Sequence, residues 1–128
     1  MREFDTGATR DSEEGKYDYE GFLSPLALEC YAAYMHKHRK QADGKMRASD
    51  NWQKGITQEV YIKSLWRHVV TVWKIHRGIK CLDERDGHEI TRAEALCSIV
   101  FNAFGDLHEE LSNASPTQAG EMEYRWKP

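Results

Sequence analysis

The sequence predicts an all-α protein on the strength of three observations. Apolar residues recur at helical spacing in three long segments, no segment alternates as a strand does, and start and stop signals bracket the helical segments. The chain has 128 residues, which suffices for a single domain, 1–128, with a core that needs neither disulfide nor metal.

The first helix is expected to run from Pro25 to about Lys40. Ser24 is a favourable N-cap, and Pro25 suits the first helical position because its missing N–H has no partner there. The residues expected to face a core are Leu26, Cys30, Tyr31, Tyr34 and Met35.

The second helix is expected from Gln58 to about Arg77, with Thr57 as its cap and Gly78 at its end. Its apolar face carries Tyr61, Leu65, Val69 and Val72. Three further apolar residues lie away from that face, namely Ile62, Trp66 and Trp73. Such broad apolar coverage predicts a homo-oligomer built on this helix, unless the N-terminal arm covers it with Tyr17, Tyr19 and Phe22.

The third helix is expected from Thr91 to about Leu111, after a charged turn at Asp83–His88. Its predicted core side carries Leu96, Val100, Phe104, Leu107 and Leu111. Three regions follow from these elements: an irregular arm over 1–22 whose second half is expected to dock, a helical core over 23–111, and a loose polar tail over 112–128.

Composition excludes several classes of function. The net charge is −3 and 30% of the residues are charged, so neither nucleic acid nor a membrane surface is an expected partner. A helical DNA-binding protein is disfavoured because no basic recognition helix is present. The three cysteines show no metal-binding spacing, and the N-terminus has no apolar leader segment. These features predict reduced thiols in a soluble, cytoplasmic protein.

The loop Ser49–Gly55 points to a nucleotide. Asn51 offers amide hydrogen bonds, Trp52 an aromatic face and Lys54 a cation, which match a base edge, a base face and a phosphate. The alternative makes Asn51 a turn residue and Trp52 a core plug.

A polar stripe on the third helix offers oxygen ligands for a hard metal ion. Glu94, Ser98, Asn102, Gly105 and Glu109 fall within a sector of roughly 80°. The alternative is the solvated face of an amphipathic helix. For Glu94, a capping box with Thr91 is a second alternative.

His68 lies at the margin of the apolar face of the second helix. A hydrogen-bonded core histidine is one interpretation. The neighbouring Arg67 supports another, in which the pair brackets a phosphate.

Taken together, these residues resemble a family of phage dATP/dGTP diphosphohydrolases related to the all-α MazG-like nucleotide pyrophosphohydrolases. The longer matching stretches are distinctive, whereas the short pairs are not. The resemblance runs from residue 4 to about 110 and is carried by Phe4–Arg10, Gly15–Pro25, Tyr34–Arg39, Ser49–Gly55, Arg67-His68, His76–Gly78, Glu94–Leu96 and Phe101-Asn102.

The resemblance implies hydrolysis of a purine deoxynucleoside triphosphate to the monophosphate and pyrophosphate with Mg or Mn, in some phages in support of 2-aminoadenine DNA synthesis. Host cytoplasm is the compartment it implies. The catalytic residues would be Glu94 and His68, and the metal ligands Glu29 and Glu94. The substrate-binding residues would be Lys16, Lys54 and Arg67 for phosphate, and Asn51, Trp52 and Asn102 for sugar or base.

The chain departs from the MazG-like pattern of paired carboxylates. The family places the second acid of each pair three residues after the first. Here those two positions hold Ala32, after Glu29, and Cys97, after Glu94. Further ligands would have to come from Asp18, Glu20 or the Asp83–Asp86 turn. The alternative function is a non-catalytic helical module that binds a nucleotide or a host protein.

Overall fold

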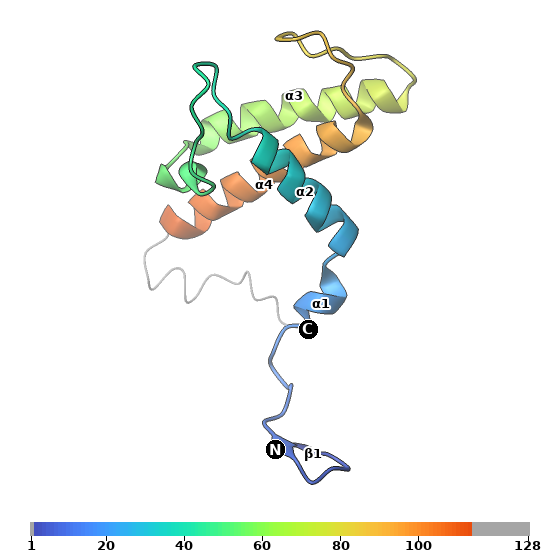
Figure 1. Ribbon diagram of the computed structural model, residues 1–128, viewed down its shortest axis with the longest axis vertical. Coiled ribbons are helices and arrows are strands. Elements are labelled where there is room, and N and C mark those ends of the chain that lie inside the picture. The colour runs from blue at the N-terminus through green and yellow to red at the C-terminus, as the bar shows by residue number, and fades with distance from the viewer. Residues whose placement is uncertain (1, 114–128) are drawn as a thin grey trace.

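The computed structural model describes residues 2–113 and confirms an all-α fold. The helices are α1 (Tyr19–Phe22), α2 (Pro25–Lys37), the short 3-10 helix η1 (Asn51–Lys54), α3 (Gln58–His76) and α4 (Arg92–Asn113). Two short strands, β1 (Arg2–Glu3) and β2 (Thr9–Arg10), form an antiparallel hairpin. Helices α3 and α4 lie side by side, and α2 crosses α4 (Figure 1).

The predicted helix starts are confirmed by their caps. The side chains of Ser24, Thr57 and Thr91 each accept a hydrogen bond from the amide three residues later, at 3.1, 3.4 and 3.1 Å. The helix ends are close to expectation, although α2 ends at Lys37, three residues before the predicted Lys40. The third helix continues through residues 112 and 113 of the predicted tail, and 114–128 lie outside the described residues.

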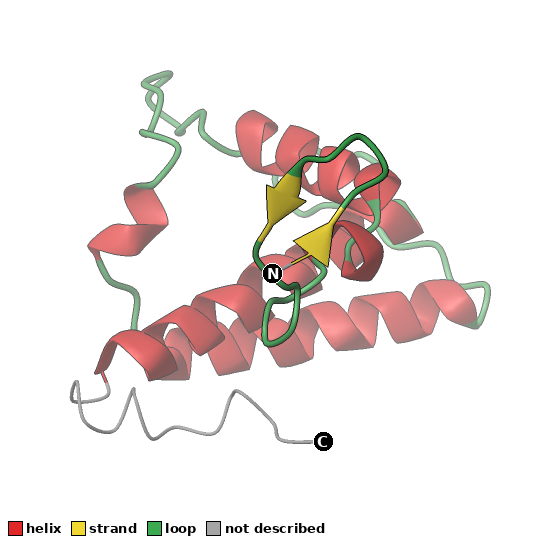
Figure 2. Ribbon diagram, turned by 90° about the horizontal axis from the view of Figure 1, so that it is seen from below, coloured by secondary structure: helices red, strands yellow, loops and turns green. Residues whose placement is uncertain are grey.

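The N-terminal arm lies apart from the long helices. Figure 1 shows the arm running away from the N-terminal end of α2, and Figure 2 shows its two strands as short arrows. The expectation that its second half docks is wrong for the described chain, because Tyr17, Tyr19 and Phe22 are all exposed, Phe22 to 79%. The arm therefore does not cover the apolar residues of α3.

The inner face of α4 is the reverse of the predicted one. The residues of α4 that are buried are Ala95, Cys97, Ser98, Asn102 and Gly105. Leu96, Phe104 and Leu107, predicted to face the core, are exposed, Phe104 to 58%. The polar stripe is consequently not a solvated face.

A size match between α3 and α4 explains this reversal. Tyr61 on α3 is the most completely buried large side chain, with 1% of its surface exposed, and its ring lies against Gly105. Only a residue without a Cβ leaves room for that ring. The polar groups beside it are satisfied locally, since Asn102 Nδ2 donates to the Ser98 carbonyl at 2.7 Å and Ser98 Oγ donates to the Glu94 carbonyl at 3.2 Å.

Many large apolar side chains remain exposed on the single chain. Ile62, Trp66 and Trp73 of α3 are uncovered, as the sequence predicted, with Trp66 exposed to 63% and Trp73 to 60%. On α2 the prediction of a core face is wrong for Leu26, which is exposed because α2 extends beyond α4 at its N-terminal end (Figure 1). It is also wrong for Cys30, which is exposed although its sulfur contacts Cys97 of α4. Among residues 2–113, no helix has the length and apolar character that a bilayer span requires.

Candidate functional site

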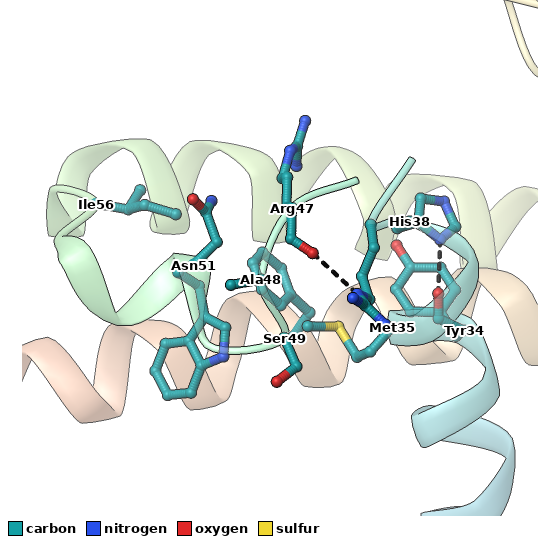
Figure 3. A pocket seen from close by; sticks show the side chains of 11 residues that line it. Tyr34, Met35, His38, Arg47, Ala48, Ser49, Asn51 and Ile56 are labelled. Atoms are coloured by element: carbon teal, nitrogen blue, oxygen red, sulfur yellow. Dashed lines mark hydrogen bonds between the residues drawn. The ribbon is translucent and has the colours of Figure 1, made fainter. Parts of the chain in front are cut away.

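A first cavity of about 190 Å³ lies between the end of α2, the loop that follows it, and α4. It contains the predicted nucleotide-binding residues Asn51 and Trp52, together with Arg39 and Arg47. In the close view Asn51 and Ile56 lie toward one end and Tyr34 and His38 toward the other (Figure 3). The cavity therefore combines amide, aromatic and guanidinium groups.

The loop that forms this cavity is held together by its own backbone. The Arg47 amide donates to the Arg39 carbonyl at 2.8 Å, and Arg39 Nε donates to the Arg47 carbonyl at 2.9 Å. The 3-10 helix that carries Trp52 ends at Gly55, which has a φ of 119° and so takes a conformation that side chains disfavour. The Trp52 ring meets His108 of α4 edge-on, with 4.8 Å between ring centres.

A second cavity of about 260 Å³ shares Tyr34, His38 and Phe101 with the first. It brings together His68 of α3 with Glu94 and Asn102 of α4, three of the residues predicted from the sequence. The remaining polar lining comes from Ser64, Thr71, Asp83, Arg85 and Ser98. The polar stripe of α4 thus has three different environments. Glu94 faces the second cavity, and Gly105 packs against Tyr61 of α3. Glu109 accepts a hydrogen bond from the Ile56 amide at 3.5 Å.

Tyr34 and His38 form the wall common to both cavities. Their rings are 4.1 Å apart, and His38 Nδ1 lies 2.8 Å from the Tyr34 carbonyl, to which it donates. This bond leaves Nε2 of a neutral His38 ring as an acceptor. Burial raises the pKa of Tyr34, so its hydroxyl stays protonated and donates to Ser98 Oγ at 2.8 Å.

The charged turn between α3 and α4 reaches the second cavity. Asp83, Asp86 and His88 place one ligand atom each within 4.8 Å of one another, a group that can hold a metal ion. His88 Nδ1 lies 2.5 Å from Asp86 Oδ1, and its Nε2 lies 2.9 and 3.0 Å from the two oxygens of Glu94. These hydrogen bonds, first to Asp86 and then to Glu94, raise the pKa of His88.

The carboxylate of Glu94 therefore turns toward His88 instead of completing a capping box. Thr91 Oγ1 accepts the Glu94 amide, which is one half of that motif, but the reciprocal bond gives way to the contact with His88. On the same charged turn, Arg85 binds Asp83 through Nη2 at 3.1 Å and Nε at 3.3 Å. The Arg85 side chain and amide hold the pKa of Asp83 well below its usual range.

His68 is half-buried between these groups. Burial, and secondarily the charge of Arg67, lowers its pKa. His68 is accordingly neutral near pH 7 and can accept a proton. The neighbouring Arg67 is exposed and lines neither cavity.

Four predicted site residues lie outside the two cavities: Lys16, Glu29, Lys54 and Arg67. Lys16 belongs to the exposed arm and Glu29 to the exposed part of α2. Conversely, the structure adds Tyr34, which the sequence predicts only as a core residue, and His38 and Arg85, to which the sequence assigns no role in the site. The Asp83–Asp86 turn was named as an alternative source of ligands, and His88 extends it.

Comparison with models of known protein families, with curated proteins and with solved structures finds no match for this chain.

Proposed function

We propose that the protein is a metal-dependent nucleotide pyrophosphohydrolase that converts a purine deoxynucleoside triphosphate, dATP or dGTP, to the monophosphate and pyrophosphate. The observation that supports this most is the sharing of one wall, Tyr34, His38 and Phe101, by two cavities of different chemistry. One is suited to a base and the other to a charged phosphate chain. The family resemblance assigns Asn51 and Trp52 to the sugar or base, and both line the first cavity, whereas Asn102, assigned with them, lines the second.

In this proposal the first cavity binds the nucleoside. Trp52 offers an aromatic face and Asn51 an amide, so that one stacks on the base and the other bonds to its edge. Arg39 and Arg47 line the same cavity and are the cations available there, since guanidinium groups bind phosphate oxygens in pairs.

The second cavity would hold the phosphates and a divalent cation. Asp83 and Glu94 line this cavity, and Asp86 and His88 lie beside them on the turn. Together they offer carboxylate oxygens and one imidazole nitrogen, which suits Mn or Mg. A cation bound there would polarise a phosphoryl oxygen and lower the pKa of a bound water. Arg85 would neutralise phosphate charge, and neutral His68 would accept the proton of the attacking water.

The test measures hydrolysis and binding together. The full chain is incubated with each dNTP and with Mn or Mg, and the products are separated by chromatography. We expect monophosphate and pyrophosphate from dATP or dGTP. The substitution Glu94→Gln should abolish turnover while changing the free energy of unfolding by less than about 1 kcal/mol, because the helix start keeps its Thr91 cap.

One control variant and one variant of a proposed metal ligand make the result specific. Glu59→Gln removes an exposed carboxylate of α3 that pairs with Lys63 at 2.8 Å and with no other cation among residues 2–113, and it should leave activity unchanged. Asp86→Asn should weaken Mn binding, measured by calorimetry without nucleotide. Full activity of Glu94→Gln would reduce Glu94 to a helix-start residue and refute its catalytic role.

The second candidate is a non-catalytic module that binds a nucleotide or a host protein. One observation favours it: Glu29, the other carboxylate that the resemblance assigns to the metal, is exposed and lines neither cavity of the single chain. This candidate predicts tight nucleotide binding with no product in the same assay.

A further inference from the structure

Two of the three cysteines of the chain face each other across the contact between α2 and α4. The sulfur atoms of Cys30 and Cys97 lie 3.8 Å apart, although 67 positions separate the two residues in the sequence. A disulfide bond is about 2.05 Å long, so the sulfurs must approach by only about 1.8 Å.

The two thiols differ in their access to solvent. Cys30 is exposed, whereas only 6% of the surface of Cys97 is exposed to solvent. Burial, followed by the proximity of Cys30, raises the pKa of Cys97 to about 11. An oxidant in solution therefore meets Cys30 first, and Cys97 is positioned to react only with what is attached to Cys30.

We propose that Cys30 and Cys97 form a reversible disulfide that joins α2 to α4 when the protein meets a low-molecular-weight disulfide. The Cys30 thiolate attacks one sulfur of the small disulfide and releases one small thiol, leaving a mixed disulfide on Cys30. Cys97 then loses its proton and attacks the Cys30 sulfur, releasing the second thiol. Two protein thiols are oxidised and one small disulfide is reduced to two thiols.

The cross-link lies beside the wall that the two cavities share. Tyr34 follows Cys30 by one helical turn, and Ser98 follows Cys97 directly, so the hydrogen bond between Tyr34 and Ser98 is the next contact along the same crossing. A disulfide at this point ties α2, which is otherwise exposed toward its N-terminus, to the helix that carries Glu94. The oxidised protein thus has a fixed cavity wall.

The third cysteine provides an internal control. Cys81 lies in the loop after α3, and its thiol contacts the Ile79 carbonyl at 3.8 Å. With Cys30 and Cys97 paired, no other cysteine remains for it within the chain. Under the same oxidation Cys81 should remain a thiol or carry a small-molecule adduct.

The test equilibrates the folded full chain with graded ratios of oxidised to reduced glutathione. Acid quenching, alkylation and peptide mapping by mass spectrometry then identify each cysteine. We expect a Cys30–Cys97 cross-linked peptide lighter by two hydrogen atoms than its reduced parts, within one chain. Cys81→Ser should form it equally, and Cys30→Ser should form none. Cys97→Ala should stop at glutathione on Cys30.

Thermal unfolding gives a second measurement that does not depend on those variants. The cross-linked protein should melt at least about 5 °C above the reduced protein, because the bond closes a long loop in the unfolded chain. The absence of the cross-link at a large excess of oxidised glutathione would overturn the proposal. So would its formation no faster in the folded chain than in urea.

Discussion

The ring of Tyr61 on α3 lies directly over Gly105 on α4, in the space that a Cβ at position 105 would occupy. The ring meets Phe101 edge-on at 5.8 Å between ring centres, one turn earlier along α4. This contact brings the two longest helices together over their polar and glycine positions.

Gly105→Ala should destabilise the fold. The added methyl collides with the Tyr61 ring, and overpacking of this kind costs about 1–3 kcal/mol, offset in part by the better helix propensity of Ala. We expect a net loss of about 1–2 kcal/mol in urea unfolding. Ala103→Ser, at an exposed position of the same helix, is the control and should change little. An unchanged stability of Gly105→Ala would show that the helices can separate at no cost.

Tyr61→Phe should be neutral or stabilising. The Tyr61 hydroxyl is buried and has no hydrogen-bond partner among the described residues. An unsatisfied buried hydroxyl costs about 1–3 kcal/mol, so its removal should not lower the unfolding midpoint. A loss above about 1 kcal/mol would reveal a partner for the hydroxyl in the assembled protein.

Stability should fall in mildly acidic solution through His68. Its folded pKa lies below the ordinary 6.5 because of burial and Arg67, so the folded state resists protonation more than the unfolded chain does. The contribution of His68 is therefore complete above pH 6.5 and declines as the pH falls toward the lowered value. Comparing melting curves from pH 8 to 5 for the protein and for His68→Gln checks this, since the variant should show a shallower decline.

Trp52→Ala should weaken nucleotide binding more than it slows turnover at saturation. A base that stacks on the indole would lose about 1–3 kcal/mol of binding free energy. Trp52 also packs on His108, so the melting temperature of the free protein must be measured in parallel. Trp52→Phe should recover part of the affinity. A large loss of stability with unchanged affinity in the folded fraction would assign Trp52 to packing alone.

The protein should form a homo-oligomer through α3. Trp66 and Trp73 are exposed on one chain, and the arm does not cover them. Large apolar side chains exposed together on one helix mark an interaction surface, and a symmetric partner would bury them. Light scattering at micromolar concentration should exceed the 14.9 kDa of one chain, and Trp66→Lys with Trp73→Lys should reduce it. A 14.9 kDa species for the unmodified protein would end the oligomer prediction.

Local signals in the sequence predicted the helices well. Ser24, Thr57 and Thr91 act on amides three residues away, so their effect is readable without tertiary structure. Gly78 likewise ends α3 through a φ of 81° just after the last turn. The prediction of three main helices is confirmed for this reason, whereas the arm, expected to be irregular, contains the β1–β2 hairpin and α1.

The orientation of α4 was not predictable from its apolar periodicity. Hydrophobic spacing favoured Phe104 and Leu107 as the inner face, but the volume of one aromatic ring on another helix decided otherwise. The candidate site was predicted only in part, because helical periodicity places residues on a helix but does not give the path of a loop. Glu94, His68 and Asn102 lie on regular helices, whereas the contact of His88 with Glu94 depends on the path of a loop.

The contact between Gly105 and the Tyr61 ring also sets the rotation of α4 about its own axis. A helix that packs through a smooth apolar stripe can turn by some tens of degrees and still fill the same space. Here a turn would drive a Cβ into the Tyr61 ring and break the bond between Tyr34 and Ser98. Glu94 lies on the same stripe, three helical turns from Gly105. The helix rotation that Gly105 fixes therefore also sets the direction in which Glu94 leaves the helix. The direction of a carboxylate is thus governed by the one residue of the stripe that has no side chain.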